Sequence, residues 1–236
     1  MALPTVCILA GGLGTRLGAR VDDTPKPLLE IAGEPFLVHQ LRLLAAHGVS
    51  DVVLCIGYRG DAIEDRIGPS CGGVRVRYSR DSPQLDGTLG AIRRAIDMLG
   101  ERFLVLYGDT YLRIDYSAAT AAWNASGLPA MMTVLRNAGR WDASNADFDG
   151  ARVTAYDKRS ADRRLQWIDY GLGGLESRLV HEYEATTRDL ADLYAALSAR
   201  GELFGFEATE RFYEIGTPEA FDETDRFLRQ TPIRAD

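Results

Sequence analysis

An apolar run that stops at a glycine-rich loop, near the start of the chain, constrains the fold more than any other feature. Residues 5–10, TVCILA, have the composition of a short buried strand. The loop GGLGTRL at 11–17 follows directly, and Lys26 lies between Pro25 and Pro27 shortly afterwards. Glycines let backbone N–H groups approach phosphate oxygens, and arginine and lysine supply positive charge. We therefore expect a buried strand that ends at an anion-binding loop.

The spacing of this loop excludes two common phosphate-binding motifs. The P-loop of NTPases needs a lysine directly after its last glycine, whereas Thr15 and Arg16 follow Gly14 here. The Rossmann dinucleotide fingerprint needs a third glycine where this chain has Leu17. The loop alone is also compatible with a tight turn that carries a solvated arginine. The lysine between two prolines favours the anion site, because the prolines limit the backbone around it.

Strand and helix patterns alternate through the first half of the chain. Four further apolar runs predict strands, and two segments with apolar residues at helical spacing predict helices. This alternation predicts an α/β fold with a mostly parallel sheet that is flanked by helices. The strands are expected at 52–56, 74–78, 103–107 and 130–135, and the helices around 37–45 and 89–99.

The second half of the chain has a less regular pattern. Asp149 and Gly150, within residues 148–156, are a strong hairpin signal. Because no repeat or linker is evident, we expect one domain over 1–236, with a small β insertion that covers the C-terminal edge of the sheet. The other elements are expected at 165–175 (strand), 188–200 (helix), 203–206 and 212–215 (strands) and from Pro218 onward (helix).

Charge and hydropathy exclude several function classes. The net charge is −7 and the pI is about 5.1, which argues against a nucleic-acid surface. No basic cluster suggests a membrane surface, no apolar stretch reaches the roughly 18 residues of a membrane span, and no basic segment precedes the first apolar run as in a signal peptide. Cys7, Cys55 and Cys71 lack metal-ligand spacing, and scattered thiols favour the cytosol. We expect a cytoplasmic protein with no nucleic-acid or membrane partner.

A carboxylate follows the strand predicted at 103–107. Ligands of open parallel sheets bind beyond the carboxyl ends of the strands, and this strand ends in Gly108 and Asp109. An acid in that place can hold Mg²⁺, which prefers oxygen ligands. A helix cap or a turn is the alternative role for Asp109, and the anion loop on a neighbouring strand favours the metal site. Glu214 stands out among later acids, because it follows aromatic strand residues and precedes a predicted helix.

Two motifs, GGLGTRL and PKPL, resemble the signature of the sugar-1-phosphate nucleotidyltransferases, the NDP-sugar pyrophosphorylases. The resemblance continues in the family's order from about residue 4 to 228. Residues 212–219, FYEIGTPE, are similar to the family's W-x-D-I-G-T-P-E segment, and 86–91, DGTLGA, are similar to its base-reading loop. The resemblance implies a Rossmann-like, GT-A-like fold of the nucleotide-diphospho-sugar transferases.

Five positions depart from the family pattern; two of them are Leu89, which replaces a small residue, and Arg159, which replaces a proline. Glu214 stands where the family has an aspartate, and its longer arm keeps the charge while moving the oxygens outward. Asp157 stands before Lys158 where the family has a glutamate, and Asp86 replaces a leucine in the base-reading loop.

The resemblance implies an Mg²⁺ cofactor and a role for each motif. Arg16 would act on the departing pyrophosphate, and Lys26 would stabilise charge at the α-phosphate. Asp109 and Glu214 would hold the metal. The implied nucleotide-binding residues are Leu9, Ala10, Gly11, Gly12, Gly14, Thr15, Gln84, Gly87 and Thr88, and the implied sugar phosphate-binding residues are Ser144, Asn145, Asp157, Lys158, Asp169, Tyr170 and Gly171.

The implied reaction joins an NTP and a sugar 1-phosphate, the two expected partners, into an NDP-sugar and pyrophosphate. The attacking phosphate is already an anion at neutral pH, so no general base is required. The segments WDASN and IDYG are most similar to those of heptose-1-phosphate guanylyltransferases, followed by N-acetylmuramate-1-phosphate uridylyltransferases. The residues determine neither base nor sugar. A cytidylyltransferase for an alcohol phosphate and a non-catalytic nucleotide-sensing module remain alternatives, and assembly into a homo-oligomer is left open.

Overall fold

The strand at the centre of the fold is β1 (Val6–Leu9), which lies between two parallel neighbours. It pairs with β4 (Asp51–Ile56) and with β7 (Arg102–Tyr107), and β6 (Val74–Arg80) pairs with β4. Apolar side chains fill both faces of β1, β4 and β7, as expected where helices cover both sides of a parallel sheet. The strands predicted at 52–56, 74–78 and 103–107 are confirmed, and each is longer by one or two residues at one end. The computed structural model describes residues 2–12, 17, 24–81, 87–137, 139–141, 143–159, 165–183 and 188–231.

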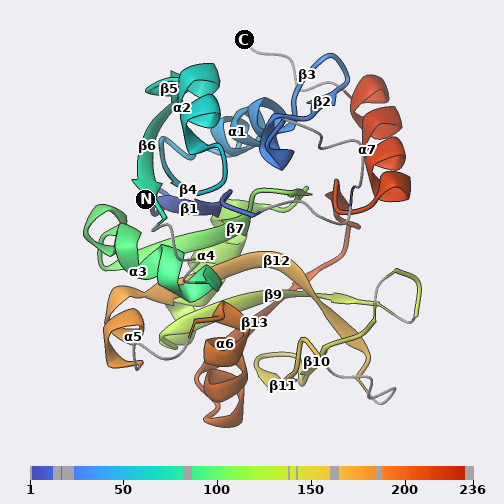
Figure 1. The fold of residues 1–236 in the computed structure, drawn as a ribbon. Coiled ribbons are helices and arrows are strands. Elements are labelled where there is room, and N and C mark those ends of the chain that lie inside the picture. Colours follow the sequence, from blue (N-terminus) through green and yellow to red (C-terminus); the bar gives the residue numbers. More distant parts are fainter. Residues whose placement is uncertain are drawn as a thin grey trace.

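The sheet continues beyond β7 with antiparallel strands. β12 (Trp167–Glu176) runs antiparallel to both β7 and β9 (Ala130–Arg136), and β13 (Leu203–Ala208) pairs in parallel with β9. The predicted hairpin is formed by β10 (Ala146–Phe148) and β11 (Val153–Tyr156), and β10 also pairs with β12. The β insertion therefore extends the main sheet through β12 (Figure 1). That it covers the C-terminal edge stays a prediction.

Helices pack on both faces of the sheet (Figure 1). α1 (Phe36–Ala46), α2 (Gly60–Ile67) and α4 (Tyr116–Ser126) contribute to the core cluster on one face. α3 (Gly87–Leu99), α5 (Ser177–Glu182) and α6 (Leu190–Ala199) contribute to the cluster on the other face. The remaining elements are η2 (Lys26–Leu28), β2 (Glu30–Ile31), β3 (Glu34–Pro35), β5 (Ser70–Cys71), β8 (Thr110–Tyr111), β14 (Tyr213–Glu214) and α7 (Pro218–Gln230).

Local signals account for the ends of several helices. The helix predicted from Pro218 is confirmed, and the Thr217 hydroxyl accepts the backbone N–H of Ala220 at its start. α4 was not predicted, although Asp115 caps it and Gly127 ends it with a φ of +66°.

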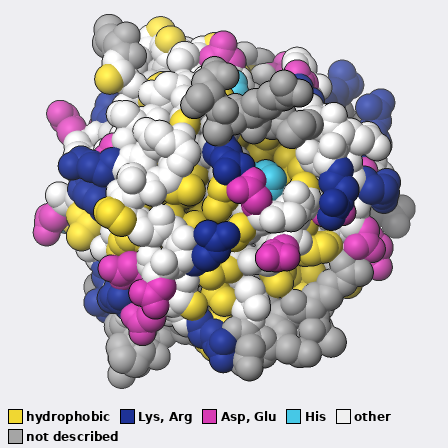
Figure 2. Space-filling view, turned by 90° about the horizontal axis from the view of Figure 1, so that it is seen from above, with side chains coloured by type: hydrophobic (Ala, Val, Ile, Leu, Met, Phe, Trp, Pro, Cys, Tyr) yellow, Lys and Arg dark blue, Asp and Glu magenta, His cyan; other side chains and the backbone are white. Residues whose placement is uncertain are grey.

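The described surface carries both signs of charge. Ion pairs link Arg42 with Glu34 and Arg229 with Asp225. Figure 2 shows Lys/Arg and Asp/Glu side chains interspersed on the face seen from above, with hydrophobic side chains visible between them. Among the described residues, no helix combines the length and the apolar composition needed to cross a membrane.

A close contact between β12 and α4 yields a test of the packing. A Cβ added at Gly174 would lie 2.7 Å from Cζ3 of Trp123, whose side chain is fully buried. We expect Gly174→Ala to lower the free energy of unfolding by about 1–3 kcal/mol, because the ring must move in a filled core. Urea unfolding measures this change. Trp123→Phe leaves room for the added methyl group, so the double variant should lose less than the sum of the single losses; strict additivity would contradict the proposed clash.

Candidate functional site

The carboxyl ends of β1 and β7 meet at a glycine. The backbone N–H of Gly108 donates to the Leu9 carbonyl at 2.9 Å. A Cβ at position 108 would lie 2.9 Å from that oxygen and 3.1 Å from Cα of Ala10. Only glycine therefore allows this approach, and it places Asp109 directly beside the loop that follows β1.

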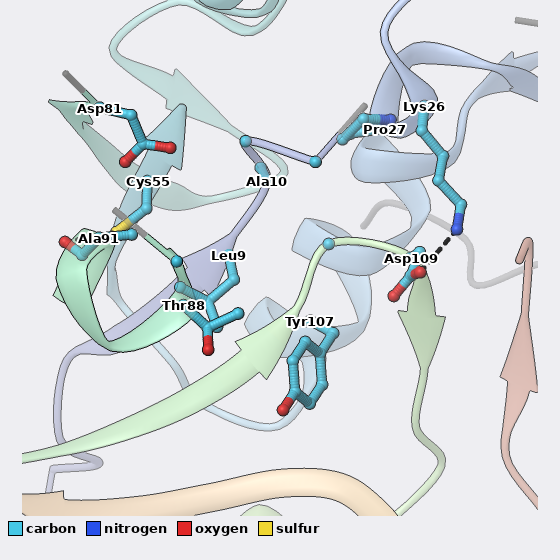
Figure 3. A pocket seen from close by; sticks show the side chains of 14 residues that line it. Leu9, Ala10, Lys26, Pro27, Cys55, Asp81, Thr88, Ala91, Tyr107 and Asp109 are labelled. Atoms are coloured by element: carbon cyan, nitrogen blue, oxygen red, sulfur yellow. Dashed lines mark hydrogen bonds and ion pairs between the residues drawn. The ribbon is translucent and has the colours of Figure 1, made fainter. Parts of the chain in front are cut away.

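Lys26 and Asp109 form an ion pair across this junction. Nζ of Lys26 lies 2.6 Å from Oδ2 of Asp109, and the side chains are only 10% and 28% exposed. Lys26 opens the η2 turn, in which the N–H of Leu28 donates to the Pro25 carbonyl at 2.8 Å. Figure 3 shows the lysine reaching down to the carboxylate from this turn. The ammonium is thus held by a short rigid turn rather than by a flexible loop.

A first cavity of about 310 Å³ opens beside this ion pair (Figure 3). Its walls come from the ends of β1, β4, β6 and β7, from η2 and from the first turns of α3. Eight of the residues assigned to the nucleotide, to catalysis or to the metal line it: Leu9, Ala10, Gly11, Gly12, Lys26, Gly87, Thr88 and Asp109. The other lining residues are Pro27, Cys55, Asp81, Ala91, Tyr107 and Gly108. Gly14, Thr15, Arg16 and Gln84 lie outside the described residues.

Asp81 is the acidic residue that sequence analysis did not assign to this cavity. It follows β6, and its N–H donates to the Ile56 carbonyl at the end of β4. A Cβ on Gly11 would lie 2.4 Å from Oδ2 of Asp81, and one on Gly57 would lie 2.9 Å from it. The two glycines thus let the carboxylate lie against the backbone of the loop (Figure 3). The strand-end rule that indicated Asp109 applies equally to Asp81.

Thr88 is engaged by the chain that precedes α6. Its hydroxyl donates to the Asp189 carboxylate at 3.0 Å and accepts the N–H of Leu190 at 2.8 Å. In return, the N–H of Leu89 donates to the Arg188 carbonyl at 2.9 Å. The first turns of α3 and α6 therefore cap one another. Thr88 lines the first cavity while its hydroxyl serves this reciprocal cap.

A second, larger cavity of about 640 Å³ lies on the β12 side of Asp109. Seven of the residues assigned to the sugar phosphate or to the metal line it: Asp109, Asn145, Lys158, Asp169, Tyr170, Gly171 and Glu214. Ser144 and Asp157 are not among its lining residues. The Ser144 hydroxyl accepts from Asn137, and the Asp157 carboxylate accepts the N–H of Arg159 in an exposed turn. Their contact with a sugar phosphate stays a prediction.

Asp169 is the centre of a hydrogen-bond network in the second cavity. Its carboxylate accepts the Tyr156 hydroxyl at 3.2 Å and the N–H of Gly171 at 2.9 Å, and its own N–H donates to the Asn145 side chain at 2.8 Å. Desolvation raises the pKa of Asp169, although these hydrogen bonds and the nearby Lys158 ammonium act in the opposite direction.

The two cavities share Tyr107 and Asp109. Tyr107 ends β7, and the Lys158 ammonium lies 5.7 Å from the centre of its ring. One ligand in each cavity would therefore meet the other near Tyr107 and Asp109, where Lys26 pairs with Asp109 and Lys158 lies over Tyr107. Such a junction suits two anionic ligands that repel each other in water.

Asp109 and Glu214 fit a magnesium ion. β14 pairs with β8 so that Glu214 lies opposite Thr110, and the N–H of Ile215 donates to the Asp109 carbonyl at 3.0 Å. Both carboxylates line the second cavity. Within the described residues, no group of three or more acidic, histidine or cysteine side chains could hold a metal. Mg²⁺ is commonly bound by one or two carboxylates together with substrate phosphates, so this pair suffices for it.

A model of the MobA-like NTP transferase domain family matches residues 6–202. The chain belongs to this family. It is 28% identical over 219 residues to the D-glycero-alpha-D-manno-heptose 1-phosphate guanylyltransferase of Campylobacter jejuni, covering 91% of this chain and 95% of that protein. It is 29% identical over 226 residues to the glucose-1-phosphate cytidylyltransferase of Salmonella typhi, covering 85% and 86% of the two chains.

Solved structures share the fold. HddC from Yersinia pseudotuberculosis, complexed with GMP-PN, superposes with a TM-score of 0.79 at 25% identity, covering 96% of this chain and 100% of that one. The expected GT-A-like fold, the resemblance to sugar-1-phosphate nucleotidyltransferases and the enzyme class of nucleotidyltransferase are thereby confirmed.

The raised pKa of Asp169 has a consequence for stability. The folded protein holds this proton more tightly than the unfolded chain, whose aspartates titrate near pH 3.9. Stability should therefore fall as pH rises from about 4 through the raised pKa. We expect Asp169→Asn to flatten this part of the profile and to raise the melting temperature more at pH 7 than at pH 4. Thermal unfolding across this range measures it. Asp157→Asn, at an exposed acid nearby, should keep the wild-type slope, and parallel profiles for wild type and Asp169→Asn would contradict the prediction.

Proposed function

We propose that this chain transfers a guanylyl group from GTP to a heptose 1-phosphate and releases pyrophosphate. The two cavities share Asp109, which pairs with Lys26, and Tyr107, which lies beside Lys158, and this shared boundary carries the proposal. In this arrangement the first cavity takes the nucleotide and the second takes the sugar phosphate.

The chemistry follows from the positions of these charges. A phosphate oxygen of the sugar attacks the α-phosphorus, the bond to the bridging oxygen breaks, and pyrophosphate leaves with that electron pair. The attacking oxygen is already ionised, so no proton has to move. Lys26 stabilises charge at the α-phosphate. Lys158 holds the sugar phosphate in place despite the repulsion between it and the nucleotide phosphates. Arg16, outside the described residues, is assigned to the departing pyrophosphate by the family resemblance.

Mg²⁺ is the proposed cofactor, with Asp109 and Glu214 as its protein ligands. When bound, it neutralises negative charge on the phosphates. In the structure, the Lys26 ammonium forms an ion pair with the Asp109 carboxylate. A nucleotide phosphate that attracts the lysine would leave the Asp109 carboxylate to the metal, so nucleotide and metal should bind cooperatively.

The Asp81 carboxylate supports guanine as the base. Guanine presents two adjacent donors on its pairing edge, N1–H and the N2 amino group, and a carboxylate can accept both. Uracil presents carbonyl oxygens on both sides of its N3–H, and cytosine presents the N3 acceptor beside its amino group; a carboxylate repels these acceptors. A buried site built for two donors rejects a base that lacks them. The guanylyltransferase among the relatives and the GMP-PN complex of HddC agree with this base.

The sugar is assigned as a heptose 1-phosphate on two grounds. The matched guanylyltransferase of Campylobacter jejuni acts on a heptose 1-phosphate, and its similarity covers 91% of this chain. The second cavity, at about 640 Å³, lies within the size range of small-molecule sites and has room for a sugar with an extended side chain.

Base choice can be tested at Asp81. We expect wild-type kcat/KM to be highest for GTP in a pyrophosphate-release assay with GTP, ATP, CTP and UTP. Asp81→Asn should lower the GTP value on the order of a hundredfold, because two charge-assisted hydrogen bonds are weakened. It should raise the relative use of UTP, whose acceptor and donor match an amide. Asp61→Asn, at a surface acid on α2 that pairs with Arg80, is the matched control.

Other outcomes of this panel contradict the proposal in different ways. A wild-type preference for UTP or CTP would remove the guanine assignment. Turnover with choline phosphate instead of sugar phosphates would indicate the cytidylyltransferase alternative. Nucleotide binding by calorimetry without pyrophosphate release would indicate a binding module.

The pairing of Lys26 with Asp109 yields a separate prediction about metal affinity. Lys26→Met should reduce turnover to below about a tenth of wild type, because charge at the α-phosphate loses its partner. The same variant should bind Mn²⁺ more tightly than wild type when no nucleotide is present, since its carboxylates lack a competing cation. Electron paramagnetic resonance of free Mn²⁺ measures the affinity. Asp109→Asn should lose both turnover and Mn²⁺ binding, and unchanged Mn²⁺ affinity in Lys26→Met would overturn this account of the metal site.

A further inference from the structure

An arginine–glutamate pair forms the part of the second cavity that comes from α7 and from the segment before β14. Arg211 lies between β13 and β14, and its guanidinium binds the Glu223 carboxylate of α7 through two bonds, Nη1–Oε1 at 2.5 Å and Nη2–Oε2 at 3.0 Å. Both side chains line the cavity. The Nε–H donates to the Phe212 carbonyl at 3.2 Å, so these contacts use three of the five N–H groups of the guanidinium.

Aromatic rings hold this pair in place. The guanidinium lies 4.7 Å from the centre of the Tyr213 ring and 5.8 Å from that of Trp141. Trp141 also packs against Phe212, at 6.3 Å between ring centres, and Phe212 packs edge-on against Tyr170 at 5.9 Å. Trp141, Phe212 and Tyr170 all line the second cavity. Flat aromatic surfaces beside fixed hydrogen-bonding groups suit a polyhydroxy ligand.

The charge around the pair is balanced or negative. Glu223 neutralises Arg211, while Glu219 also lines this cavity. A ligand carboxylate near Arg211 would therefore meet a guanidinium that is already paired, in a cavity that holds a further acidic group. Neutral hydroxyl groups avoid that repulsion, and they can accept from the two remaining N–H groups and donate to the glutamate oxygens.

We propose that Arg211 and Glu223 determine sugar specificity by binding the end of the sugar remote from its phosphate, and that they select a neutral vicinal diol over a carboxylate. This inference rests on the proposed function, in which Lys158 and Asp109 hold the phosphate end. A heptose carries such a diol on its side chain. A hexose such as mannose ends in a single hydroxymethyl group, and N-acetylmuramate carries a carboxylate.

Rates with three sugar 1-phosphates test the inference. With GTP as donor, heptose, mannose and N-acetylmuramate 1-phosphates are compared by kcat/KM in wild type, Arg211→Gln and Glu223→Gln. Arg211→Gln should lower the heptose value about tenfold, which corresponds to about 1.4 kcal/mol, and the mannose value less than threefold. Glu223→Gln releases the arginine charge, so it should raise the ratio of N-acetylmuramate to heptose at least tenfold.

A matched control separates recognition from simple loss of an ion pair. Asp225 lies on the same helix as Glu223 and pairs with Arg229, and it does not line the cavity. Asp225→Asn should leave the ratios among the three sugars unchanged. Equal losses for heptose and mannose in Arg211→Gln, at normal wild-type turnover, would show that the pair is only a structural tether and would overturn this inference alone. A wild type that releases no pyrophosphate with any of the sugars would overturn the proposed function together with it.

Discussion

The parallel pairing of β1 with β7 is the constraint on which the whole site depends. It brings two segments a hundred residues apart in sequence, the loop after β1 and Asp109, to one edge of the sheet. The approach is closed by Gly108, whose N–H meets the Leu9 carbonyl where any side chain would collide with backbone. Because parallel strands end together, every catalytic group that follows them faces the same space.

The charged groups at this edge of the sheet are paired with one another, and the proposed substrates and metal would replace these pairs. In the structure, the largely buried Lys26 ammonium is neutralised by Asp109, which avoids the cost of isolated charges in a poorly solvated place. The proposed substrates carry several negative charges, and the proposed metal carries two positive ones. Binding would thus replace one balanced pair with a larger balanced set.

Local patterns were sufficient to predict the parallel strands around β1 and the position of Asp109 after one of them, because a buried strand and the turn that ends it are encoded in a short segment of sequence. Strand direction beyond β7 was not predictable in this way, since the apolar run of β12 has the same composition whichever way it runs. Contacts between segments far apart in the sequence could not be predicted from local patterns either. Nothing near Thr88 indicates that its hydroxyl binds Asp189, and nothing near Arg211 indicates its partner on α7. Asp81 could have been assigned from the sequence, because it follows the carboxyl end of a predicted parallel strand, as Asp109 does.

The reciprocal cap between α3 and α6 also affects when the first cavity can form during synthesis of the chain. The bond from Thr88 to Asp189 spans 101 residues, and its partners secure the helix start that lines the first cavity. A ribosome must therefore have released most of the chain before the turn of α3 that lines the first cavity gains its caps. A nascent or truncated chain that ends before α6 would expose an unfinished pocket, so the ability to engage nucleotide would arise late in synthesis, close to the completion of the fold.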